Sequence, residues 1–214
     1  MTIPKWISWA GLAAMIGGLI AILLTPPFAI AGDTAYHIFD VPPFWMHSLK
    51  PALTPLLTFA PPVAVYNTYG RIFDLVYLLF LPAMFGLHHL HQGVRGRIEK
   101  WGFAVVVIGL IAAFIGVAGD YWVEGVVFYF SEILGLLLMS VGTTLYGVAI
   151  LRSGVVPRWC GWLFVSCLPG TFVFSLLIPH IPSGQTFLFA VSWLMMGLVL
   201  LFNKGVQLEK HGAG

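Results

Sequence analysis

The sequence predicts an all-α integral membrane protein, a six-helix transmembrane bundle, because it is largely apolar and its few charges are clustered. Of the 214 residues, 59% are hydrophobic and 8% are charged, whereas about 25% of residues are charged in an ordinary soluble domain. Several apolar windows of about 20 residues hold one ionisable group or none, and this length crosses roughly 30 Å of hydrocarbon. We therefore expect a lipid bilayer around the chain. Its Lys and Arg residues form no stripe that could follow phosphates, which excludes nucleic acid as a partner.

Six apolar segments are long enough to be transmembrane helices, and we expect the whole chain, residues 1–214, to be one transmembrane domain. The predicted spans cover residues 6–25, 68–90, 101–118, 126–151, 159–178 and 186–202. Trp101 and Trp159 lie at span ends, as in the aromatic belt at a membrane surface. The N-terminal segment also resembles a secretory signal, but its apolar run is longer than a signal requires, so we expect an uncleaved first span.

The segment between the first two spans is expected to remain on the outer side. Residues 26–65 contain a loop and then an apolar stretch, Pro51–Ala64, that is too short for a span and holds four prolines. Proline removes a backbone donor, so this stretch is predicted to be an interfacial or re-entrant segment. Counting it as a seventh span would move the later basic clusters to the side opposite Lys5, against the concentration of basic residues in cytoplasmic loops.

With six spans, most basic residues lie on one side of the membrane. Those on that side are Lys5, Arg95, Arg97, Lys100, Arg152, Arg158, Lys204 and Lys210. Short cytoplasmic loops are rich in Lys and Arg. This pattern predicts a bacterial plasma-membrane protein with both termini in the cytoplasm.

A tandem helical-hairpin repeat is a further interpretation. Shifting the chain by 58 residues aligns spans two and three with spans four and five, and pairs Asp74 with Glu132, Gly96 with Gly154, Lys100 with Arg158 and Trp101 with Trp159. The alternative is a chance alignment of apolar sequences.

Small residues are spaced so that helices can approach closely. Gly109 with Ala113, and Ser131 with Gly135, are small residues four positions apart. In lipid, such pairs allow close contact between helix backbones. They predict a compact bundle.

Two acidic residues, Asp74 and Glu132, lie inside predicted spans near the outer side. An ionised carboxylate at that depth is costly unless it has a partner, and buried carboxylates bind cations, relay protons or act as general acids. Both are candidate substrate-binding or ion-binding residues. The structural alternative for Asp74 is an ion pair with Arg71, three residues earlier. For Glu132 the alternative is a hydrogen bond to Ser131, Tyr129 or another helix.

Histidines suggest a metal site on either side of the membrane. On the outer side the candidate ligands are His37, Asp40, His47 and His180, and the alternative is an amphipathic cap in the membrane interface. On the inner side, His88 and His91 share a helix face beside His89 and could hold a metal or haem iron. The alternative there is contact of imidazoles with a helix C-terminus and lipid headgroups.

Three functions remain open. The preferred hypothesis is a small-solute or ion-binding bundle, such as a transporter, channel or sensor, that uses Asp74 and Glu132 to hold a solute or cation. A second is a non-catalytic subunit that assembles with copies of itself or with a partner membrane subunit. A third is a membrane enzyme or redox subunit whose histidines hold a metal or haem. No nucleotide-binding or serine-hydrolase motif is present, and the sequence identifies no cofactor.

Overall fold

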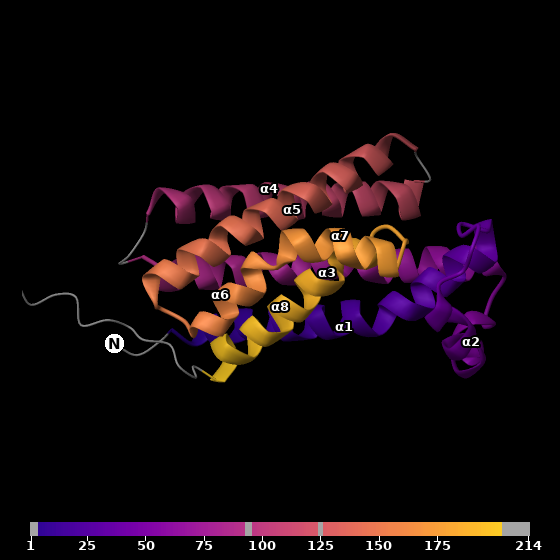
Figure 1. Cartoon of the computed structure of the whole chain (residues 1–214), viewed down its shortest axis with the longest axis horizontal. Helices are drawn as coiled ribbons and strands as arrows, with labels where there is room; N and C mark the ends of the chain where they lie inside the picture. The colour runs from indigo at the N-terminus through magenta and orange to yellow at the C-terminus, as the bar shows by residue number, and fades with distance from the viewer. Residues whose placement is uncertain (1–3, 93–95, 124–125, 203–214) are drawn as a thin grey trace, which may run out of the picture.

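The computed structural model describes residues 4–92, 96–123 and 126–202, and these form helices joined by short loops, with no strand among them (Figure 1). In chain order the elements are α1 (Lys5–Tyr36), α2 (Phe44–Leu57), α3 (Pro62–Leu90), α4 (Arg97–Ala118), the π-helix η1 (Gly119–Val123), α5 (Val126–Ser153), α6 (Arg158–Val165), α7 (Cys167–Leu177) and α8 (Ser183–Phe202). The predicted all-α class is confirmed.

Five of these helices are long and apolar enough to cross a membrane: α1, α3, α4 with η1, α5 and α8. The pair α6 and α7 passes the same test together but is bent by 52°. If this bent pair is one span, the count reaches the predicted six. At 14 residues, α2 is too short to cross, and it lies beside the end of the bundle opposite the N-terminus (Figure 1).

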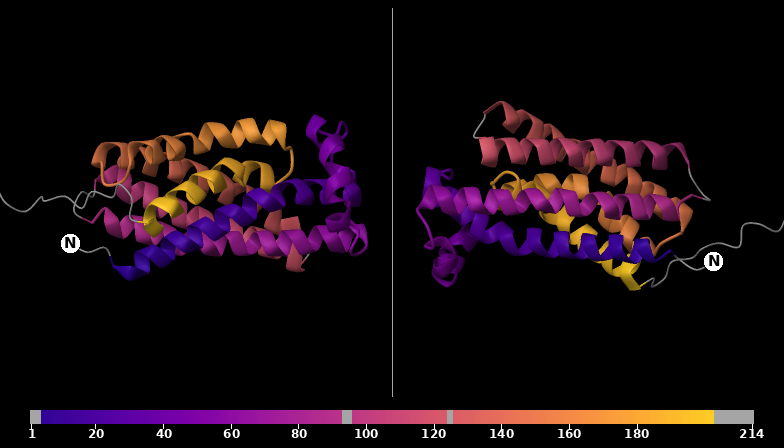
Figure 2. Two further views of the ribbon diagram at one scale, coloured as in Figure 1. Left: turned by 90° about the horizontal axis from the view of Figure 1, so that it is seen from below. Right: turned by 180° about the vertical axis from the view of Figure 1, so that it is seen from behind.

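The apolar helices run along the long axis of the bundle (Figure 2), and their contacts form a closed ring of neighbours. Around the ring, α1 packs on α3, α3 on α4, α4 on α5, α5 on α6 and α7, α7 on α8, and α8 on α1. Aromatic side chains fill the middle of the ring. Phe80 of α3 stacks on Trp193 of α8 with 5.9 Å between ring centroids, and Phe164 of α6 lies 5.1 Å from the same indole.

Glycines bring α4 and α5 into backbone contact. On α4 they are spaced by seven residues, as are those on α5, and the positions are Gly102, Gly109, Gly116, Gly135 and Gly142. A Cβ at any of them would collide with backbone atoms of the facing helix. In lipid, close packing of this kind stabilises helix pairs through van der Waals contact. The predicted role of Gly109 and Gly135 as packing residues is confirmed.

Several helices extend beyond the predicted spans. The first span was expected to end at Thr25, yet α1 continues through Pro26 and Pro27 to Tyr36. Pro26 and Pro27 lack the N–H groups that would bond the carbonyls of Ile22 and Leu23, and internal proline of this kind is tolerated in transmembrane helices. Similarly, α3 begins at Pro62 and not at residue 68, because proline suits the first turn of a helix.

The predicted fifth span, residues 159–178, is broken at Ser166 between α6 and α7. Pro169 cannot donate to the carbonyl of Val165, which would leave a buried acceptor unsatisfied. The side chain of Thr144 on α5 compensates: its hydroxyl lies 3.3 Å from that carbonyl oxygen and accepts from the backbone N–H of Leu168 at 3.1 Å. The same break distinguishes the two hairpins of the predicted repeat, since α4 is continuous, and the repeat stays a prediction.

The described basic residues concentrate at one end of the bundle, which we call the basic end. Lys5, Arg97, Lys100, Arg152 and Arg158 belong to helix termini at that end, where the N-terminus lies (Figure 1). Arg95, Lys204 and Lys210, predicted on the same side, lie outside the described residues. We call the other end, which carries α2 and η1, the opposite end.

The glycine contacts predict that Gly109→Ala lowers thermal stability. Its new methyl group would meet the backbone of Met139, and overpacking of this kind costs about 1–3 kcal/mol. The matched control is Gly96→Ala, because a Cβ at Gly96 would have no atom within 4 Å. Melting temperatures of the detergent-purified variants, followed by circular dichroism, check this; equal losses in both would contradict it.

Candidate functional site

Asp74 and Glu132 are buried acidic side chains in the interior of the helical bundle. Asp74 is 4% exposed on α3 and Glu132 is 1% exposed on α5. One oxygen of each, Oδ1 of Asp74 and Oε1 of Glu132, has no hydrogen-bond partner. Neither residue forms an ion pair within the described part of the chain. A buried carboxylate without a partner is strongly disfavoured, so each group is either neutral or accompanied by a bound cation.

Packing places these two residues at the same depth. Gly70 of α3 packs against the ring of Tyr121, and Gly116 of α4 packs against the backbone of Glu132. Tyr121 therefore marks a common reference level. Gly116, and with it Glu132, lies five residues or about 7.5 Å of helix from Tyr121. Asp74 lies about 6 Å along α3 from Gly70, in the same direction along the bundle. Asp74 lies further from the start of its helix than the sequence predicts, because α3 begins six residues before residue 68.

The predicted ion pair between Arg71 and Asp74 does not form. Arg71 turns away from the acid, and its Nε donates to the backbone carbonyl of Tyr121 at 3.0 Å. Its guanidinium group lies 4.8 Å from the centre of a ring of Trp122, a favourable cation–π contact. The π-helix η1, which carries both partners, therefore competes with Asp74 for this cation.

Three tyrosines, Tyr66, Tyr77 and Tyr121, lie in the neighbourhood of Glu132. The hydroxyls of Tyr66 and Tyr121 are hydrogen-bonded at 2.8 Å, and that of Tyr77 lies 3.2 Å from the hydroxyl of Thr186 on α8. All three tyrosines lie within electrostatic range of Glu132, and Tyr77 is also within range of Asp74. We call Asp74, Glu132, Tyr66, Tyr77 and Tyr121 the carboxyl–tyrosine cluster.

The residues of the predicted outer metal site are not brought together. His37, Asp40 and His47 are exposed to solvent, whereas His180 is 2% exposed and packs edge-on against Phe28. Burial lowers the pKa of His180 to about 3, so its imidazole is neutral. Among the described residues no three His, Cys, Asp or Glu side chains are placed to hold a metal ion. These four residues therefore give no support to a metal site.

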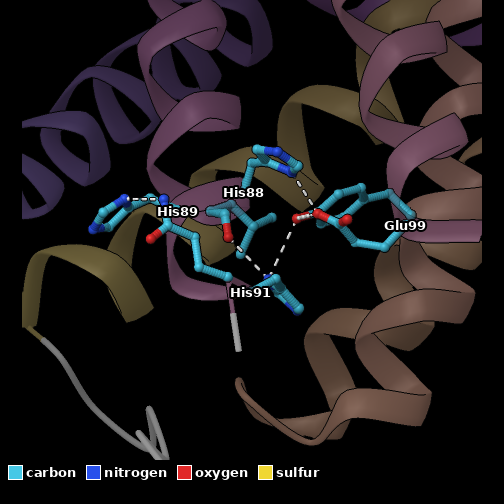
Figure 3. Close-up of polar contacts among 7 residues, drawn as sticks. His88, His89, His91 and Glu99 are labelled. Carbon is cyan, nitrogen blue, oxygen red and sulfur yellow. Dashed lines mark hydrogen bonds and ion pairs between the residues drawn. The ribbon is translucent and has the colours of Figure 1, made fainter. Parts of the chain in front are cut away.

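A second acidic cluster lies at the basic end (Figure 3). Glu99 of α4 is 2% exposed. Its Oε1 is paired with Nδ1 of His88 and accepts a hydrogen bond of 3.0 Å from the hydroxyl of Tyr146. That hydroxyl also lies 3.3 Å from Nδ1 of His91. We call His88, His91, Glu99 and Tyr146 the histidine–glutamate cluster.

The three inner histidines do not converge on one point. His88 and His91 turn toward Glu99 and Tyr146, whereas His89 turns away and is hydrogen-bonded to Gln92 at 2.8 Å (Figure 3). His88 also stacks on the ring of Phe103. This arrangement differs from a shared metal or haem site, in which imidazoles point at one atom.

Sequence reasoning missed Glu99 and the tyrosines. Glu99 stands between Arg97 and Lys100 in the first turn of a helix, a pattern typical of an exposed position. Its signal is its spacing: it lies three residues before Gly102, on the glycine face of α4. Tyr77 lies three residues after Asp74 on the same face of α3, and this spacing could have indicated that it lies near the acid. No sequence pattern indicates the position of Tyr121.

The burial of His180 predicts that the protein is less stable in acid. The unfolded chain has an ordinary histidine pKa of 6.5 and the folded chain one of about 3. Between these values the unfolded state binds one more proton, so the free energy of unfolding falls as pH falls, by at most about 1.4 kcal/mol per pH unit. Melting temperatures at about pH 7.5 and pH 5 should differ less in His180→Asn than in the wild type. The exposed His47→Asn is the control, and an unchanged pH dependence in His180→Asn would contradict the assignment.

Comparison of the chain with protein-family models, with curated proteins and with solved structures found no match. The chemistry of the two clusters therefore rests on their geometry.

Proposed function

We propose that the protein binds a proton or a small monovalent cation at the carboxyl–tyrosine cluster and carries it across the membrane. Glu132 is the principal binding group, and Asp74 is the second. The observation that carries this proposal is the burial of Glu132 without a basic partner among the described residues. Such a site is neutral only when a proton or another cation occupies it.

The neighbouring tyrosines support binding of a cation. A carboxylate and several hydroxyl oxygens are hard donors, which suit protons and alkali cations better than soft metals. The hydroxyl of Tyr77 is close to both acids electrostatically and is anchored to Thr186. This links the site on α3 and α5 to α8, so occupation of the site affects three helices of the ring.

The broken helix supports transport in place of simple binding. Discontinuous helices in the middle of a bundle are typical of secondary transporters, where unwound segments allow one part to move against another. The break at Ser166 lies between α6 and α7, and both segments contact α5, the helix that carries Glu132.

Orientation in the membrane follows from charge. By the preference of basic residues for cytoplasmic loops, the basic end faces the cytoplasm. We place the protein in a bacterial plasma membrane with both termini in the cytoplasm and the carboxyl–tyrosine cluster nearer the outer surface.

The test is Glu132→Gln, which keeps the side-chain size but removes the titratable oxygen. Protein is reconstituted in liposomes that contain the pH-sensitive dye pyranine, and proton entry is driven by a potassium diffusion potential. We expect the flux to fall by about 100-fold, the scale of losing a positioned proton-transfer group. Binding of other cations is measured in parallel as the rise in melting temperature with LiCl, NaCl, KCl or choline chloride, and that rise should also be lost.

The matched control is Asp40→Asn, which removes an exposed acid and should behave as wild type. Unchanged elution volume and melting temperature in the absence of added cation would show that Glu132→Gln is folded. A folded Glu132→Gln variant with wild-type flux and wild-type cation response would refute the proposal. So would a wild-type protein that carries no protons and responds to none of these cations.

A further inference from the structure

The histidine–glutamate cluster is a separate site from the carboxyl–tyrosine cluster. Tyr146 and Glu132 are 14 positions apart on α5, which corresponds to about 21 Å along the helix. Between them lie the buried apolar side chains of Leu136 and Met139. The proposed binding of a cation at Glu132 therefore does not explain why a second acid is buried at the basic end.

Burial in this cluster increases step by step from the surface inward. The side chain of His88 is 18% exposed and that of Glu99 is 2% exposed, while Tyr146 is fully buried. Hydrogen-bonding contacts connect the three in that order, from Nδ1 of His88 to Oε1 of Glu99 and on to the Tyr146 hydroxyl. A partly exposed imidazole is thus joined to a buried carboxyl group by one direct contact.

Among the described residues, the titratable and charged groups that contact or flank Glu99 come from three helices. From α3 they are His88 and His91, and from α5 the group is Tyr146. On α4 itself, Arg97 and Lys100 flank the acid but are exposed. His88 and Tyr146 both contact Oε1, whereas Oε2 of Glu99 is buried and has no hydrogen-bond partner.

We propose that the pair of His88 and Glu99 is a proton-binding site that exchanges one proton with the solution at the basic end. In the uptake step, a proton from the solution binds Nε2 of the neutral His88 imidazole while the Nδ1 proton passes to the carboxylate of Glu99. The Nδ1–H bond breaks and an Nε2–H bond and an O–H bond form, so the pair gains one proton and both side chains are neutral; release is the reverse of this step. Tyr146 is a positioning residue, because its hydroxyl donates to the same carboxyl group and holds it toward His88.

The role of this site in transport rests on the proposed function, since a proton carried past Glu132 must leave or enter at the basic end. Binding of the proton at Glu99 does not depend on the proposed function. A purely structural ion pair between α3 and α4 is the competing explanation. Such a pair would keep one protonation state throughout the pH range in which the protein is folded.

The experiment follows the carboxyl group of Glu99 by infrared difference spectroscopy. Spectra of purified protein are recorded against pH, and the carboxyl bands that are present in the wild type and missing from Glu99→Gln are assigned to Glu99. We expect a protonated-carboxyl band to appear as the pH falls, together with a change in an imidazole band. In His88→Asn the pH at which the Glu99 band changes should shift. In Asp40→Asn it should not.

A Glu99 band that does not change with pH, or that changes at the same pH in His88→Asn, overturns the proposal. Tyr146→Phe gives a second test that preserves packing: it should move the frequency of the Glu99 band by removing one hydrogen bond, and an unmoved band also counts against the site. Pyranine flux separates this inference from the proposed function. Glu99→Gln should slow proton flux while keeping the melting-temperature response to cations, whereas Glu132→Gln loses both.

Discussion

Backbone contact between α4 and α5 is the constraint that positions both acidic clusters. Glu132, Met139 and Tyr146 follow one another at intervals of seven on α5 and pack over Gly116, Gly109 and Gly102 of α4. The missing side chains of the glycines leave the space that these residues occupy. One repeated packing unit therefore sets Glu132 at one level, Tyr146 at another and an apolar side chain between them. Because Glu99 lies one turn before Gly102, the same face also buries Glu99 beside Tyr146.

Polar side chains form hydrogen bonds with the backbone groups that the break between α6 and α7 leaves without helical partners. At the break between α6 and α7, Thr144 accepts from the N–H of Leu168 and reaches the carbonyl of Val165, and Ser192 donates to the carbonyl of Leu163 at 3.2 Å. In a bilayer each such group would otherwise cost several kcal/mol. Among the buried side-chain atoms without a hydrogen-bond partner in the described residues, Oδ1 of Asp74 and Oε1 of Glu132 belong to groups that can carry a charge, whereas Nε1 of Trp193 and Oγ1 of Thr143 do not. The proposed function gives these two carboxyl groups a ligand.

Hydropathy predicts the apolar helices, and small-residue spacing predicts the packing faces, because both depend on properties that are local in sequence. The burial of Asp74 and Glu132 is predictable for the same reason. The burial of Glu99 has only one sequence indication, its spacing from Gly102, because its charged neighbours are exposed and its own burial depends on where α5 packs. Continuation of α1 beyond Pro26 and the break at Ser166 also escape sequence reasoning: proline permits either a kink or an end, and neighbouring helices decide which occurs.

If the proposed function holds, the interior between the clusters favours a carrier over an open pore. A channel needs a continuous polar path through the bundle, but here Phe80 stacks on Trp193 in the middle of the ring. Met139, which packs over Gly109 between the levels of Glu132 and Tyr146 on α5, is fully buried. Apolar side chains therefore lie between the two clusters. A carrier requires that separation at every moment of its cycle, because a cation bound at one end must not leak to the other. In the proposed transport cycle, passage would require a rearrangement of the ring, and the break between α6 and α7 is a position where the regular helical hydrogen bonds are interrupted.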